Sequence, residues 1–111
     1  MHWKKHTRWL NSFMFLDGLY SVTDSSVSEA TVVLTDENHP VFQAHFPSQP
    51  ILPGFVHLEI ISDVFKLEIS GVKKAKYMNI VLPSQILHYI KNSNKITVTC
   101  NNKDVASFNI V

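Results

Sequence analysis

The sequence predicts an α+β fold in which an antiparallel sheet wraps around one long, buried helix. Three observations lead to this prediction. Residues 55–67 are apolar around most of a helical circumference, which is typical of a buried helix. Segments rich in β-branched residues, or alternating between apolar and polar residues, lie on both sides of it. Short polar turns separate the segments that follow the helix, as in antiparallel hairpins.

Six strands are expected, two before the helix and four after it. The first is rich in aromatic and aliphatic residues and contains Gly18, which is typical of a bulge. The fifth alternates apolar residues with threonine, as a half-buried strand does. The expected ranges are 13–23, 27–35, 73–82, 85–90, 96–100 and 105–111.

Residues 36–53 differ from both neighbouring segments. Four of the five prolines of the chain fall here. Because proline fixes φ and removes a backbone donor, we expect a stiff loop that forms neither a regular helix nor a strand. This loop contains His45. Pro53-Gly54 then opens the helix, since proline suits a first helical turn, and Gly71 is the expected stop.

Composition narrows the class of protein. The 111 residues are enough for one domain, residues 1–111, and the hydrophobic fraction of 45% is sufficient for a packed core. A net charge of +1 indicates neither a nucleic-acid partner nor an acidic tail. The single cysteine, Cys100, fits a reducing cytoplasm, and no apolar run is long enough to cross a membrane. We therefore expect a cytoplasmic protein.

The polar residues of the helix form a narrow stripe, because they recur at i, i+3, i+4 and i+7. They are Glu59, Ser62, Asp63 and Lys66. A carboxyl group on an otherwise apolar helix is a candidate acid, and a histidine in a stiff loop is a candidate base, because it titrates near neutral pH. The alternative for Glu59 is a solvated polar face, in which it pairs with its helical neighbours.

A denser motif joins the loop to the helix. It consists of His45-Phe46-Pro47, then Pro50-Ile51-Leu52-Pro53-Gly54, then Glu59, which follows His45 by 14 residues. This frame resembles the signature of the FabZ-type 3-hydroxyacyl-acyl-carrier-protein dehydratases. The resemblance implies a hot-dog fold and removal of water from a 3-hydroxyacyl thioester to give the trans-2-enoyl thioester. Fatty acid synthesis or a related polyketide or aryl-polyene synthesis would use this reaction.

The resemblance also implies a role for each site residue. His45 would be the base that takes the α-proton, and Glu59 the acid that assists departure of the β-hydroxyl. The backbone N–H of Gly54 would hold the thioester carbonyl, where a preorganised donor is typically worth about 3 kcal/mol. The two side chains would come from different subunits of a homodimer or of an oligomer of dimers. The acyl chain would lie in a tunnel lined by Phe46, Ile51, Phe55 and Val56.

Three positions depart from the family pattern. Ala44 and Ser48 stand where glycine is usual, and Asp63 stands where the FabZ type usually has glutamine. Asp63 is expected to act on Glu59 from one helical turn away rather than to touch the substrate. These departures favour a divergent, specialised member.

The expected partner is an acyl carrier protein, or coenzyme A, that carries the substrate. Carrier proteins are acidic, so Lys73, Lys74 and Lys76, or the basic start at Lys4, Lys5 and Arg8, are candidate docking residues. An ordinary solubilising surface explains them equally well. The sequence contains neither paired metal ligands nor a glycine-rich phosphate loop, so no metal and no nucleotide cofactor are expected.

Two other functions remain open at this point. A hot-dog thioesterase would need a carboxylate placed to activate water. A non-catalytic subunit would bind an acyl chain or pair with a different hot-dog protein, and its best support is Asp63 together with the short strands expected near the C-terminus. Cys100 and the remaining histidines of the central and later segments, His39, His57 and His88, are expected to be structural.

Overall fold

The computed structural model describes residues 16–44 and 48–111. Within these ranges the chain forms two strands, two helices and then four strands. In order they are β1 (Tyr20–Ser25), β2 (Glu29–Leu34), α2 (Pro40–Ala44), α3 (Val56–Phe65), β3 (Val72–Tyr77), β4 (Ile86–Asn92), β5 (Lys95–Cys100) and β6 (Lys103–Ile110).

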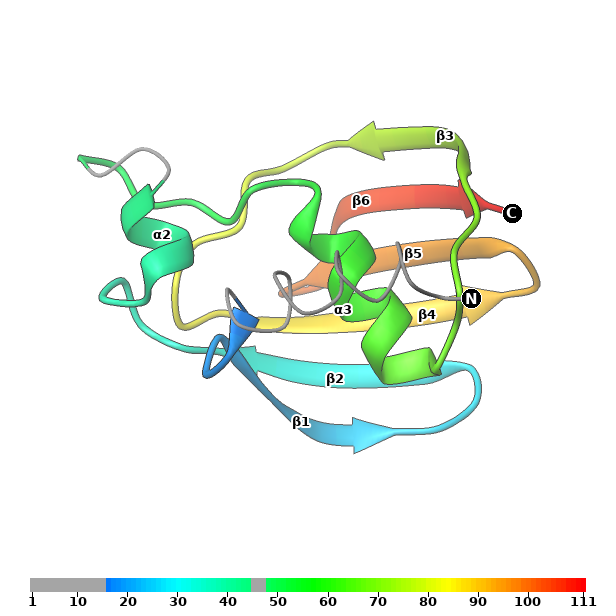
Figure 1. Ribbon diagram of the computed structural model, residues 1–111, viewed down its shortest axis with the longest axis horizontal. Helices are drawn as coiled ribbons and strands as arrows, with labels where there is room; N and C mark the ends of the chain where they lie inside the picture. Colours follow the sequence, from blue (N-terminus) through cyan, green and yellow to red (C-terminus); the bar gives the residue numbers. More distant parts are fainter. Residues whose placement is uncertain (1–15, 45–47) are drawn as a thin grey trace, which may run out of the picture.

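All six strands belong to one antiparallel sheet in the order β1-β2-β4-β5-β6-β3. The edges of the sheet are therefore β1 and β3. Helix α3 lies across one face of the sheet, and α2 lies beyond the end of the sheet, away from the strands (Figure 1). This arrangement confirms the predicted α+β class and the hot-dog fold.

The core lies between α3 and the inner face of the sheet. Alternate residues of the central strands point inward, which gives β5 the burial pattern expected of a half-buried strand. The apolar stripe of α3, Val56, Ile60 and Ile61, is fully buried against them. The largest buried side chains on the sheet are Tyr89 and Phe108.

One polar contact lies inside this core. His57, on the first turn of α3, is 2% exposed, and its Nδ1 lies 2.8 Å from the hydroxyl oxygen of Tyr89 on β4. Burial lowers the pKa of His57 to about 4 and raises the pKa of Tyr89, so both side chains are neutral near pH 7. The hydrogen bond therefore satisfies two polar groups that have no access to water, and it joins the helix to the sheet.

The start of the first strand differs from the prediction. The strand begins at Tyr20 rather than at residue 13, and residues 13–15 lie outside the described residues. Gly18 has a φ of +76° and belongs to the turn that precedes β1, where the Leu19 N–H donates to the Leu16 carbonyl. A bulge is present, but it lies between Val22 and Asp24.

The prediction that residues 36–53 contain no helix was wrong. Pro40 occupies the first position of α2, where its missing N–H costs nothing. The Val41 N–H donates to Nδ1 of His39, and Nε2 of the same ring lies 2.7 Å from the carbonyl oxygen of Asp17. Val41 and Phe42 are fully buried and anchor this short helix to the core.

The central helix is shorter than expected. It ends at Phe65, and Lys66 adopts a left-handed conformation, with φ 55° and ψ 47°. The N–H groups of Lys66 and Leu67 both donate to the Ser62 carbonyl, and the Ser62 hydroxyl donates to the Leu67 carbonyl. This cap ends the helix before Gly71. The next strand is also shorter than predicted and ends at Tyr77. No helix of the described residues is long and apolar enough to span a bilayer.

The His57–Tyr89 contact predicts a loss of stability in acid. The unfolded chain binds a proton at His57 below about pH 6.5, whereas the folded chain does so only below about pH 4. Because the unfolded state binds more protons between these values, the free energy of unfolding falls as the pH is lowered through this window. Urea denaturation at pH 7 and pH 4.5 should show a His57-dependent loss of about 2 kcal/mol.

The His57→Phe variant provides the control. It starts from a lower stability at pH 7, because Tyr89 loses its hydrogen-bond partner. Its stability should then depend less on pH than that of the wild type. Equal pH slopes for the two proteins would show that His57 does not control this transition.

Candidate active site

A pocket of about 760 Å³ lies beside α3, on the side that faces β1. One wall comes from the turn before β1 and from β1 itself, and the other from the polar stripe of α3 and the residues just after it. The lining residues that carry polar side chains are Asp17, Tyr20, Glu59, Ser62, Asp63, Lys66 and Glu68. The stripe predicted from the sequence is thus the wall of a pocket.

Glu59 lies on the first turn of α3, and its side chain is half-buried. Its carboxylate oxygen Oε1 is shielded from solvent. Asp63 follows one turn later on the same wall and is more exposed. The i, i+4 spacing therefore brings two carboxyl groups into one pocket, as the sequence predicted.

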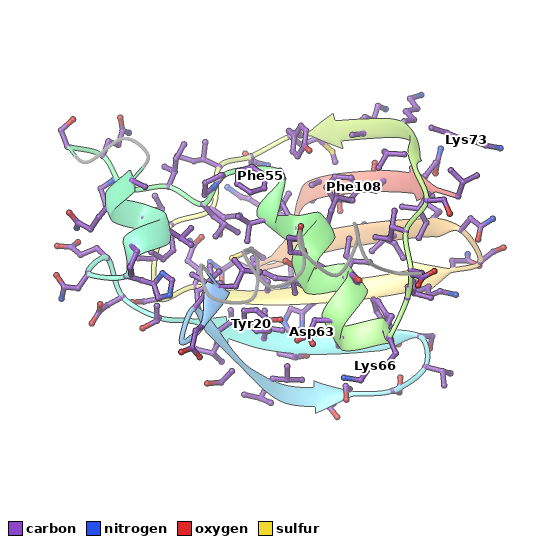
Figure 2. The ribbon with its side chains drawn as sticks, viewed as in Figure 1. Tyr20, Phe55, Asp63, Lys66, Lys73 and Phe108 are labelled. Atoms are coloured by element: carbon purple, nitrogen blue, oxygen red, sulfur yellow. The ribbon has the colours of Figure 1, made fainter. Side chains whose placement is uncertain are left out.

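Tyr20 is the site residue that the sequence analysis did not identify. Its hydroxyl donates a hydrogen bond to Oδ2 of Asp63, and Figure 2 shows the two side chains together between β1 and α3. Burial, the hydrogen bond to Asp63 and the charges of Asp63 and Glu59 all raise the pKa of Tyr20, so the hydroxyl remains protonated. The two residues are 43 positions apart, so helical spacing gave no sign of the contact.

Lys66 adds a positive charge at the far end of the stripe (Figure 2). Its left-handed backbone conformation is one that glycine adopts at lower cost. Because the side chain lines the pocket, a lysine at this position adds a cation to a lining that also contains Asp63 and Glu68. An ammonium group near two carboxylates partly balances their charge.

Gly54 lies in the turn just before α3 and does not line this pocket. A Cβ atom at Gly54 would stand only 2.6 Å from Cε1 of Tyr77. A side chain at position 54 would therefore have to displace the Tyr77 ring, which also packs edge-on against Phe108. The predicted carbonyl-binding N–H is thus beside an aromatic ring at the β3 edge.

The predicted tunnel residues occupy different environments. Val56 is fully buried in the core, Phe55 is 50% exposed at the start of α3, and Ile51 is half-buried. His45 and Phe46 lie outside the described residues. The structure thus brings Glu59 and Asp63 into one pocket. Phe55 lies at the opposite end of the helix from Asp63 (Figure 2), and Gly54 directly precedes Phe55.

The remaining histidines of the described residues have structural contacts. His39 caps α2, His57 joins α3 to the sheet, and Nδ1 of His88 lies 3.1 Å from Oγ1 of Thr31 on β2. Cys100 is buried, and burial raises the pKa of its thiol. Among residues 16–44 and 48–111, no group of histidine, cysteine and acidic side chains is arranged to hold a metal ion.

Comparison with known protein families identifies the chain. The family model of the ApeI-like dehydratases, described as ApeI dehydratase, matches residues 22–109. The chain belongs to the ApeI-like dehydratase family. The match extends from within β1 nearly to the end of β6, so it includes the motif and the α3 wall of the pocket, whereas Tyr20 and the turn before it precede the matched range.

Curated relatives of this ApeI-like chain are similar along most of its length. The 3-hydroxyacyl-[acyl-carrier-protein] dehydratase FabZ of Shewanella woodyi is 28% identical over 92 residues, covering 69% of this chain and 60% of the relative. The corresponding FabZ of Roseobacter denitrificans is 27% identical over 96 residues, covering 73% and 62%. The chain thus spans about 60% of the length of the curated relatives it matches.

Solved structures share the fold of this ApeI-like chain. The dehydratase heterocomplex ApeI:P from Xenorhabdus doucetiae matches with a TM-score of 0.61 and 17% identity, over 81% of this chain and 91% of that one. The E. coli PaaI protein from the phenylacetic acid degradation operon matches with a TM-score of 0.58 and 12% identity, over 97% of this chain and 93% of that one. Thioesterase superfamily member 2 from Mus musculus matches with a TM-score of 0.58 and 11% identity, over 96% of this chain and 90% of that one.

The close approach of Tyr77 to Gly54 predicts a specific coupling between them. Gly54→Ala should displace the Tyr77 ring and lower the stability of the fold by about 1 kcal/mol, because the new methyl overlaps the ring. In a Tyr77→Ala background the same substitution should cost much less. Thermal and urea unfolding of the four proteins measures this difference as a double-mutant cycle.

Gly71→Ala is the matched control for this cycle. Its new Cβ would meet Val111 rather than Tyr77, so its effect should be the same in both backgrounds. If Gly54→Ala also had equal effects in both backgrounds, the ring would not be what makes glycine necessary at this position.

Proposed function

We propose that this protein is a 3-hydroxyacyl-thioester dehydratase, a hydro-lyase that forms the trans-2-enoyl thioester. The observation that carries the proposal is the position of Glu59. It stands 14 residues after His45, as the dehydratase motif requires, and it lines a pocket that shields one of its carboxyl oxygens. Membership of the ApeI-like dehydratase family and similarity to FabZ proteins support the same reaction.

The elimination needs a base at the α-carbon and an acid at the β-oxygen. His45 is proposed as the base, because an imidazole accepts a proton near neutral pH. Glu59 is proposed as the acid that protonates the departing hydroxyl. The N–H of Gly54, ahead of the first turn of α3, is proposed to stabilise the negative charge that develops on the thioester oxygen.

The proposed site is shared between two subunits. The carbonyl carbon and the β-carbon of the substrate are only about 2.5 Å apart, whereas five helical residues span about 7.5 Å. Gly54 and Glu59 of one chain are therefore poorly placed to serve the same acyl group, and Gly54 does not line the Glu59 pocket. We propose that His45 and Gly54 of one subunit act together with Glu59 of the other.

The surface beside Gly54 supports such an assembly. Here β3 is an edge strand, and exposed apolar side chains lie at its last residue and just beyond it, with one more at the start of α3. They are Tyr77, Met78, Ile80, Leu82 and Phe55. We call these five residues the β3 patch. The Leu52 N–H donates to the Val81 carbonyl, so the segment after β3 lies alongside the segment that precedes α3. A second copy of the chain is the proposed partner at this edge.

The lysines of β3 favour a second candidate assembly. Lys73, Lys74 and Lys76 give this edge strand a strong positive charge, which disfavours pairing with an identical strand. A different hot-dog subunit with an acidic edge would fit better, and the similar fold of the ApeI:P heterocomplex supports this candidate. The same lysines are candidates for docking an acidic carrier protein, the proposed source of the substrate.

Removing either catalytic group should abolish dehydration. We expect His45→Ala and Glu59→Gln each to lower kcat/KM by about a hundredfold or more. The reaction is followed with a soluble 3-hydroxyacyl thioester, by the ultraviolet absorbance of the conjugated enoyl product. Release of free thiol instead of enoyl product would favour the thioesterase alternative.

Two control variants match these substitutions. His88→Ala removes an exposed histidine from β4, and Glu29→Gln removes an exposed carboxyl group from the first residue of β2. Neither residue lines the Glu59 pocket, so both variants should retain wild-type activity. A His45→Ala variant as active as the His88→Ala control would contradict the proposed mechanism.

The assembly is tested by light scattering after size-exclusion chromatography. A homodimer across the β3 patch should tighten at high salt, because screening reduces repulsion between lysines, and Ile80→Asp should dissociate it. Val27→Asp, at a position 90% exposed in the β1–β2 turn, is the control and should leave the dimer intact. A monomer at every salt concentration, inactive alone, would favour the heterodimer.

A further inference from the structure

The pocket contains two carboxyl groups where the proposed reaction needs one acid. Glu59 and Asp63 line the same wall of the pocket. On a helix, residues four apart have Cβ atoms about 6 Å apart, so both side chains can reach the same bound group. Some feature of the pocket must therefore make the two carboxyl groups unequal if only Glu59 is to serve as the acid.

Tyr20 forms a side-chain hydrogen bond with Asp63, one of these two carboxyl groups. Its O–H donates to Oδ2 of Asp63. The tyrosine is the first residue of β1, is paired in the sheet with Leu34, and packs its ring against the hydrophobic core. Thr35, which follows Leu34, donates its N–H to the carbonyl of Leu19, the residue before Tyr20. This bond also holds the start of β1 against the end of β2. The hydroxyl therefore projects from a rigid support.

The charges around the Tyr20–Asp63 hydrogen bond explain why a neutral hydroxyl is a suitable donor to Asp63. Acidic side chains line the pocket from three segments: Asp17 from the turn before β1, Glu59 and Asp63 from α3, and Glu68 from the segment after α3. Strand β1 contributes Tyr20 and Val22. Among the described residues that line the pocket, Lys66 carries the positive charge. Burial and the adjacent carboxylates raise the pKa of Tyr20, so its hydroxyl retains the proton that it donates.

We propose that Tyr20 is a positioning residue: its hydroxyl ties Asp63 to β1, so that Glu59 is the carboxyl presented to the acyl substrate. This inference rests on the proposed dehydratase function. It adds a role for Tyr20, and it gives Asp63 a fixed orientation against β1. No bond to substrate is made by either residue, and the proton lost to the β-hydroxyl comes from Glu59.

The proposal makes a definite statement about loss of the hydroxyl. Without it, the Asp63 side chain turns toward the centre of the pocket and places a second carboxyl group beside Glu59. Two coupled carboxyl groups exchange protons as a pair, so the pH dependence of the reaction changes as well as its rate. A purely structural tyrosine would change the stability of the protein and leave the pH profile of the folded enzyme as it was.

The test is a double-mutant cycle on activity. Tyr20→Phe, Asp63→Asn and the combined variant are compared with the wild type. The substrate is a soluble 3-hydroxyacyl thioester. Both kcat and KM are measured across the pH range in which the fold is intact. Tyr20→Phe should lower kcat about tenfold, leave KM nearly unchanged and displace the pH profile. In the Asp63→Asn background the same substitution should have no further effect.

Two additional variants make the result decisive. Thr23→Val removes a different hydroxyl from β1, one that donates to the Thr31 carbonyl outside the pocket, and it should leave kcat and the pH profile unchanged. Asp63→Glu keeps the charge but lengthens the side chain, so its carboxylate should lose its alignment with Tyr20. It should therefore reproduce the displaced pH profile of Tyr20→Phe even if Tyr20→Phe itself folds poorly.

The outcomes separate this inference from the proposed function. If the wild type is active and the pH profiles of Tyr20→Phe and Asp63→Glu equal that of the wild type, the positioning role alone is overturned. Equal effects of Tyr20→Phe with and without Asp63 would also overturn it, because the tyrosine would then not act through that residue. A folded wild type, inactive with every partner tested, would overturn the dehydratase function and this inference with it.

Discussion

The orientation of α3 about its own axis is the constraint on which the site depends. The helix turns its apolar stripe toward the inner face of the sheet, where Val56, Ile60 and Ile61 are fully buried. The hydrogen bond between His57 and Tyr89 fixes the first turn, because any rotation would leave two polar groups buried without partners. The polar stripe must then face β1, and the pocket forms there.

Much of this arrangement follows from periodicity in the sequence. The buried helix, the alternation of β5 and the i, i+4 placement of Glu59 and Asp63 are local patterns, and the structure has them as predicted. The local errors also have local causes. The four prolines of residues 36–53 predict a segment without a helix, yet Pro40 at the first helical position of α2 has no hydrogen bond to lose.

The contacts between segments that are distant in the sequence could not be predicted from local periodicity. Tyr20 meets Asp63 because β1 packs beside α3, and Tyr77 meets Gly54 because the β3 edge passes the start of the helix. Neither partner is marked by spacing or composition, since each contact depends on the strand order of the sheet. His45, the residue singled out most strongly by the motif, lies outside the described residues, so its place in the site remains a prediction.

The early end of α3 at Phe65 has a consequence for how the chain closes the sheet. The helix ends near β2, whereas β3 is at the far edge, four strand spacings or about 19 Å away (Figure 1). Residues 66–71 cover about 9 Å as a helix but about 20 Å when extended. Ending the helix at Phe65 therefore leaves these residues free to extend, so that the chain can reach β6 and β3 can form the lysine-bearing edge.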